Sequence, residues 1–152
     1  MALLLFPDGE TFARGAIRYN YAPATPSETT NRIILPVKVE NVRTEAILDT
    51  GAPYPIIAPK IARQAGLDRF TPLERITMLV RGMRLEGVII RLNMILPADE
   101  GEEQDISATA FVPDLEEYWG NFPSFIGQIG FLERICYAVN PSTNTFYFGE
   151  LP

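Results

Sequence analysis

The amino-acid sequence predicts a mainly β fold closed into a barrel, with one or two short helices. Its apolar stretches are short, and several alternate with polar residues as strands with one buried face do. Glycine and proline recur at short intervals and mark turns between these stretches. Only two segments, 58–66 and the turn that ends at Arg134, have a helical pattern. Many short strands and few helices are typical of a barrel or a closed sheet.

The expected strands follow one another from the start of the chain. Short strands are predicted at 1–6 and 16–21, followed at 22–31 by a polar, proline-bearing loop that we expect to be mobile. Two hairpins and three further strands come next, and they occupy 32–48, 76–96, 106–112, 135–139 and 145–148.

Length and charge limit the kind of protein. The 152 residues fit a single domain, 1–152, in which 1–31 forms an N-terminal extension. Apolar residues make up 47% of the chain and charged residues 21%, values ordinary for a soluble globular protein. The net charge of −6, without a cluster of lysines and arginines, argues against binding to nucleic acid.

No targeting or membrane-spanning segment is expected. The apolar start, Met1 to Phe6, is too short for a signal-peptide core and has no basic leader. No other run approaches the ~20 apolar residues that a membrane helix needs. The single cysteine, Cys136, lies in an apolar run, which predicts a core residue, and it allows no internal disulfide. We therefore expect a soluble, cytoplasmic protein that does not bind membranes.

The chain contains no histidine. This excludes a Ser-His-Asp or Cys-His triad and any metal site with histidine ligands. The acidic stretch 97–105 lacks the carboxylate spacing of a calcium loop and is expected to be a solvated turn, so no metal or cofactor is predicted. Catalysis, if the protein has any, must use carboxylates, lysine, tyrosine or the cysteine.

One short stretch carries the strongest chemical signal. Ala46, Ile47 and Leu48 form the apolar end of a predicted strand, and Asp49 and Thr50-Gly51-Ala52 follow directly. A carboxylate at the end of a buried strand costs solvation free energy unless nearby groups satisfy it. Gly51 has no Cβ and permits another backbone or a substrate to approach. This placement indicates a working carboxylate more than a structural one.

The stretch Ile47 to Ala52, the short helix and hairpin after it, and the later Phe125-Ile126-Gly127 together resemble a retropepsin-like aspartic protease. The order of elements matches over about residues 32–149. The resemblance implies a closed β fold in which Asp49 is catalytic, Thr50, Gly51 and Ala52 complete the active-site loop, and Ile126-Gly127 supports it. It also implies a homodimer, because the chain has one such motif where pepsin-like enzymes have two.

The resemblance implies further parts of a site that cleaves a peptide or protein substrate. The Thr50 hydroxyl would bond across the dimer axis. The tip of the second hairpin, Arg81-Gly82-Met83-Arg84, is a candidate flap over an extended peptide. The alternative is an ordinary surface hairpin, and its basic tip differs from the glycine-rich tip of the viral members.

Other interpretations of the sequence stay open. The chain is alternatively a non-catalytic peptide-binding or dimerisation module with the same fold. A third possibility is an unrelated small barrel in which Asp49 caps a turn. The aromatic residues Tyr118, Trp119 and Phe122 of the loop 113–123 either line a substrate cleft or pack on the core. The terminal segments either interleave between subunits or pair within one chain.

Overall fold

The computed structural model describes residues 1–152, and it confirms a mainly β chain with 51% of residues in strands and 8% in helices. One α-helix and two 3₁₀ turns accompany the strands: α1 (Pro59–Gln64), η1 (Leu67–Arg69) and η2 (Leu132–Arg134). The strands are β1 (Leu4–Leu5), β2 (Thr11–Ala13), β3 (Gly15–Arg18), β4 (Asn20–Pro23), β5 (Asn31–Val39), β6 (Val42–Leu48), β7 (Glu74–Val80), β8 (Met83–Leu96), β9 (Glu100–Gly101), β10 (Gln104–Pro113), β11 (Ser124–Ile126), β12 (Ile135–Asn140) and β13 (Thr145–Glu150).

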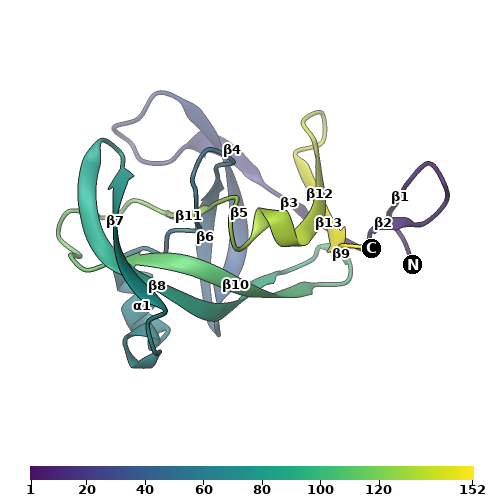
Figure 1. The fold of residues 1–152 in the computed structure, drawn as a ribbon. Helices are drawn as coiled ribbons and strands as arrows, with labels where there is room; N and C mark the ends of the chain where they lie inside the picture. The colour runs from purple at the N-terminus through teal and green to yellow at the C-terminus, as the bar shows by residue number, and fades with distance from the viewer.

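The strands form three sheets (Figure 1). The largest runs in the order β10-β8-β5-β6-β11, with β4 also paired to β5 and β7 to β8. A four-stranded sheet runs β12-β13-β3-β9, and β1 pairs only with β2. The two edges of the large sheet, β10 and β11, are connected through Ile56, which bridges Phe111 on one side and Phe125 on the other. No sheet closes on itself, so the predicted closed barrel is not confirmed.

The hairpin β5–β6 forms the centre of the large sheet because its inward residues are apolar. Leu35, Val37 and Val39 of β5 are buried in the main hydrophobic cluster, and Ala46 of β6 joins them. The return at Glu40-Asn41 places Glu40 at a φ of 54°, which a two-residue hairpin turn requires. The hairpin predicted at 32–48 is therefore present.

Strand β8 is the longest element and belongs to two substructures. Residues 83–89 pair with β7, and residues 87–96 pair with β10. The β7–β8 hairpin thus projects beyond β10 at one end of the molecule, at the left of Figure 1. The predicted second hairpin is confirmed, with a tight two-residue turn at Arg81-Gly82.

The segment predicted as one strand at 16–21 is divided into two. β3 pairs with β13, whereas β4 pairs with β5. Tyr19 lies between them, and its N–H donates to the carbonyl of Asn144 over 2.9 Å. The chain therefore passes from one sheet to the other at Tyr19. The last strand, β13, pairs with β12 and β3 of its own chain.

The helix predicted at 58–66 is present as α1. Pro59 stands at its first position, where its missing N–H costs nothing, and Gly66 follows its end with a φ of 73°. The acidic stretch 97–105 is more ordered than a solvated turn, because Asp99 accepts the N–H of Arg18 over 2.7 Å and β9 pairs with β3.

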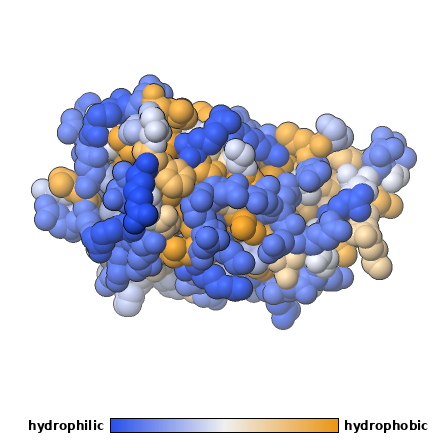
Figure 2. Space-filling model, turned by 90° about the horizontal axis from the view of Figure 1, so that it is seen from below, coloured by the Kyte–Doolittle hydropathy of each residue, from blue (hydrophilic) through white to orange (hydrophobic).

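The surface and the helices show two further features. In the view of Figure 2, hydrophobic residues emerge between hydrophilic ones that cover much of this face. No helix is long and apolar enough to cross a membrane. No group of three or more cysteine or acidic side chains is arranged to hold a metal ion.

Candidate active site

Asp49 follows the last residue of β6, and its position is fixed by a parallel strand. β11 pairs with β6 through Ser124 with Ala46, Phe125 with Ile47 and Ile126 with Leu48. The ladder ends with the N–H of Asp49, which donates to the carbonyl of Ile126 over 3.0 Å. The two motifs that the sequence places far apart therefore lie side by side.

The loop after Asp49 is held by short-range hydrogen bonds. The Asp49 carboxylate accepts the N–H of Gly51 at Oδ1 over 2.9 Å, and the Asp49 carbonyl accepts the N–H of Ala52 over 3.1 Å. Oδ2 receives no hydrogen bond from the chain. Ala52 is buried, whereas Thr50 and Gly51 are exposed at the tip of the loop. One carboxylate oxygen is thus held in place while the other stays available.

Gly127 lies where the loop and the strand β11 are in closest contact. A Cβ at this position would overlap the carbonyl oxygen of Tyr54 and would lie 2.8 Å from that of Ala52. Two hydrogen bonds continue the contact: Gln128 N–H donates to Ala52 over 2.9 Å, and Ile129 N–H donates to Pro53 over 2.6 Å. Only glycine fits this site without displacement of the backbone at Tyr54 and Ala52.

A cavity of about 240 Å³ opens beside the carboxylate. Its wall combines the loop that carries Asp49, the start of β5, the end of β7 and two residues of the core. The lining residues are Arg32, Asp49, Gly51, Ala52, Pro53, Ile56, Met78, Leu79, Val80, Arg81 and Phe125. The arrangement gives a carboxylate in a cleft that is lined by both apolar and polar side chains.

The β7–β8 hairpin forms part of the wall of this cleft, but of the predicted flap only one residue lines it. Arg81 lines the cavity, whereas Gly82, Met83 and Arg84 do not. Met83 and Arg84 instead line a separate groove with Leu115 and Tyr118. The hairpin therefore contributes Arg81 of the turn and Met78, Leu79 and Val80 of β7 to the cavity that contains Asp49.

Aromatic residues pack beneath the hairpin tip. Trp119 and Phe122 are 3% and 4% exposed, so they belong to the core, whereas Tyr118 is 54% exposed. The Trp119 Nε1–H donates to the carbonyl of Phe122 over 2.7 Å and fixes this part of the loop 113–123. Both rings contact Phe125 of β11. Packing on the core, one of the two alternatives for these residues, is correct for Trp119 and Phe122.

Arg81 connects the hairpin tip to this aromatic cluster. Its guanidinium carbon lies 3.6 Å above the centre of the Phe122 ring, which is a cation–π contact. Arg81 has a φ of 52°, in the left-handed region that non-glycine residues rarely adopt. The contact links the hairpin tip to the core aromatic residues.

Two groups in the cleft have no signal in the amino-acid sequence. Arg32 lies at the start of β5, 17 positions before Asp49, and only the fold brings the two together. Met78 and Val80 of β7 are buried and Leu79 is 72% exposed, yet all three line the cavity. The alternation of β7 marks its buried face, but it does not reveal which site that face covers.

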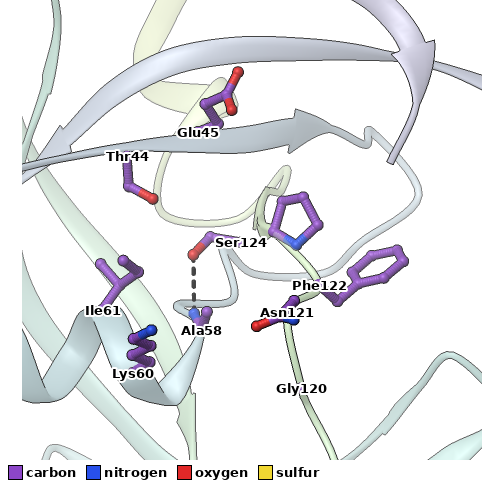
Figure 3. Close-up of a pocket in the computed structure, with 10 residues that line it drawn as sticks. Thr44, Glu45, Ala58, Lys60, Ile61, Gly120, Asn121, Phe122 and Ser124 are labelled. Carbon is purple, nitrogen blue, oxygen red and sulfur yellow. Dashed lines mark hydrogen bonds between the residues drawn. The ribbon is translucent and has the colours of Figure 1, made fainter. Parts of the chain in front are cut away.

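A second cavity, of about 280 Å³, does not include Asp49 (Figure 3). Thr44 and Glu45 of β6, the start of α1 and the loop 120–124 surround it. The buried Ser124 hydroxyl accepts the N–H of Ala58 over 2.9 Å at its centre. Of its other polar residues, Thr44 is half-buried, whereas Glu45, Lys60 and Asn121 are exposed.

Comparison with solved structures identifies the fold. The chain is similar to a retropepsin-like aspartic protease from Rickettsia conorii, with a TM-score of 0.54 and 18% identity over 88% of this chain and 89% of that one. It is also similar to the retroviral protease-like domain of Ddi1 from Leishmania major, with a TM-score of 0.53 and 19% identity over 80% of this chain and 94% of that one.

No protein-family model and no curated protein sequence matches the chain. The likeness is therefore one of structure, at identities that establish the fold alone. It confirms that the chain has the retropepsin-like fold that its two motifs predict.

Proposed function

We propose that the chain is an aspartic endopeptidase that acts as a homodimer, with one Asp49 from each subunit in a shared site. The observation that carries the proposal is the position of Asp49. It directly follows a core strand, it is bonded to β11, and it lines a cleft to which the β7–β8 hairpin contributes. Thr50 and Gly51 at the tip of the loop are exposed, so a second copy can approach them.

The proposed chemistry needs two carboxylates and a water molecule. Two carboxylates held a few ångströms apart cannot both ionise cheaply, so the pair shares one proton. The ionised Asp49 takes a proton from the water as its oxygen attacks the carbonyl carbon. The protonated Asp49 of the partner subunit gives its proton to the carbonyl oxygen as the tetrahedral intermediate forms. The first Asp49 then passes the proton taken from the water to the leaving nitrogen as the C–N bond breaks, and the hydroxyl proton returns to the partner's Asp49.

Other groups position the reaction. The Gly51 N–H that donates to Oδ1 keeps the carboxylate oriented, and Thr50 is proposed to bond across the dimer axis. The hairpin tip, with Arg81, acts as a flap that encloses an extended peptide and excludes water. The cleft of one chain is small for a peptide, as expected of half a site.

The test compares the purified protein with Asp49→Asn, which keeps the shape of the side chain. Both are incubated with a mixture of random-sequence decapeptides across acidic and neutral pH, with and without a transition-state-type inhibitor of aspartic proteases. We expect the wild type to cleave the peptides and the inhibitor to block this cleavage. The cleavage rate of Asp49→Asn should be lower by roughly 10³-fold or more. Equal cleavage by the two proteins would refute a catalytic Asp49.

The alternative is a non-catalytic module that binds peptides or dimerises through the same fold. It predicts no cleavage by the wild type, while Asp49→Asn and the wild type bind the same peptides equally well. Sedimentation at tens of micromolar is informative as well, because a protein that remains monomeric contradicts a shared site.

A further inference from the structure

The candidate cleft has a charge opposite to that of the whole chain. The protein carries a net charge of −6, yet two arginines and one carboxylate line this cavity. Arg32 enters from the start of β5, and Arg81 enters from the tip of the β7–β8 hairpin. They come from separate elements, and both share the cleft with the Asp49 carboxylate.

Arg32 is only partly satisfied by its own chain. Its guanidinium lies 3.6 Å from Glu28, beyond hydrogen-bond distance, and its Nε is buried without a partner. Oε2 of Glu28 is buried without a partner as well. A buried donor that makes no hydrogen bond costs free energy, and an incoming acceptor removes that cost. Glu28 therefore orients Arg32 but leaves it able to bind another group.

Arg81 is held in place without using its hydrogen-bond donors. Its guanidinium stacks on Phe122 at 3.6 Å, and it forms no ion pair within the chain. A guanidinium stacked on a ring has its five N–H groups around the edge, free for an acceptor. The neighbouring Arg84 lies on the same hairpin but outside this cavity.

We propose that the cleft selects peptides with an acidic side chain beside the scissile bond, whose carboxylate is bound by Arg32 and Arg81. The planar guanidinium matches a carboxylate with two parallel hydrogen bonds, which a neutral amide cannot reproduce. The apolar wall formed by Ile56, Met78 and Phe125 keeps water away from these bonds and strengthens them. The inference rests on the proposed peptidase function and adds a substrate class to it.

The test uses three pools of random decapeptides with Glu, Gln or Lys fixed at the central position. Cleavage is followed by mass spectrometry of the new ends. We expect the wild type to cleave the Glu pool about tenfold faster than the Gln pool, and the Lys pool most slowly. Arg32→Met and Arg81→Met reduce the Glu-to-Gln ratio to nearly one, whereas Arg32→Lys retains part of it.

Arg84→Met is the matched control, because it removes the same charge from the same hairpin outside the cavity. Its Glu-to-Gln ratio stays as in the wild type. A wild-type ratio near one, or equal losses in Arg81→Met and Arg84→Met, would overturn the proposal. Sedimentation of Arg32→Met is a further check, because a variant that dissociates to monomer shows that Arg32 holds subunits instead of substrate.

A capture experiment separates this inference from the peptidase function. Immobilised Asp49→Asn is exposed to the same three pools, and the retained peptides are quantified. Selective retention of the Glu pool that Arg32→Met abolishes supports the acidic preference even if the wild type cleaves nothing. Cleavage without any difference between pools supports the peptidase and refutes the acidic preference.

Discussion

The backbone N–H of Asp49 donates to the carbonyl oxygen of Ile126 over 3.0 Å, so the ladder between β6 and β11 ends on the residue that carries the candidate catalytic carboxylate. A loop that begins at the end of a core ladder cannot move without breaking it. The exposed tip at Thr50 and Gly51 therefore stands on a rigid base, which preorganised chemistry requires.

Gly127→Ala should destabilise this base. The new Cβ overlaps the Tyr54 carbonyl and approaches that of Ala52, and both are backbone atoms that cannot rotate away. Overpacking of this kind costs about 1–3 kcal/mol or more. Urea unfolding measures it, and Gln128→Ala, at an exposed neighbour, is the control that changes stability by about 0.5 kcal/mol or less. An unchanged midpoint for Gly127→Ala would contradict the close contact.

Ser124→Ala should lower stability without touching the cleft. The Ser124 hydroxyl is 1% exposed and accepts the N–H of Ala58, the residue before α1. Removing the acceptor leaves a buried donor unpaired, at a cost of about 1–3 kcal/mol. Denaturant unfolding compares the free energy of unfolding of this variant with that of Thr143→Ala, a control at an exposed position. Equal stability of the two variants would mean that the bond is not formed in solution.

Arg81→Asn should loosen the tip of the hairpin. Asparagine accepts the left-handed backbone of this position, so the substitution removes mainly the contact with Phe122. Exposed cation–π contacts contribute about 0.5–1 kcal/mol, which corresponds to a two- to fivefold faster exchange of the hairpin amides. Hydrogen exchange followed by mass spectrometry measures the exchange rate of these amides. Arg84→Asn serves as the control, and faster exchange in both variants alike would exclude a specific role of the Phe122 contact.

Thr50→Ala should weaken the proposed dimer. Each subunit loses one hydroxyl that is proposed to bond across the axis, and a hydrogen bond contributes about 0.5–1.5 kcal/mol. Two lost bonds therefore raise the dissociation constant by roughly 5- to 150-fold. Analytical ultracentrifugation over a concentration series measures the constant. Thr50→Ser restores the hydroxyl and should restore the dimer, and a dimer unaffected by Thr50→Ala would remove this contact from the proposal.

The sequence predicts elements well where the pattern is local. The hairpin turn at Arg81-Gly82 and the start of α1 at Pro59 depend on residues a few positions apart. The adjacency of Asp49 and Ile126 was also expected, but from a resemblance to a family and not from periodicity.

What the sequence did not predict depends on contacts between distant segments. The division of 16–21 at Tyr19 arises because the chain leaves one sheet for another, and no local pattern marks that change. The short strand β9 inside the acidic stretch forms only because β3 lies beside it. Arg32 belongs to the cleft only because β5 begins next to the loop that carries Asp49. Such neighbours become visible only when the sheets have been assembled.

The length of β8 has a consequence for local unfolding. Residues 83–85 of this strand pair with β7 alone, whereas residues 90–96 pair with β10 within the buried sheet. Amides of the first group can be released when the hairpin separates, at a free energy well below that of global unfolding. Amides of the second group require loss of the whole core. We therefore expect a single continuous strand to contain weakly and strongly protected amides in hydrogen exchange. The boundary lies near residues 87–89, which pair with both β7 and β10.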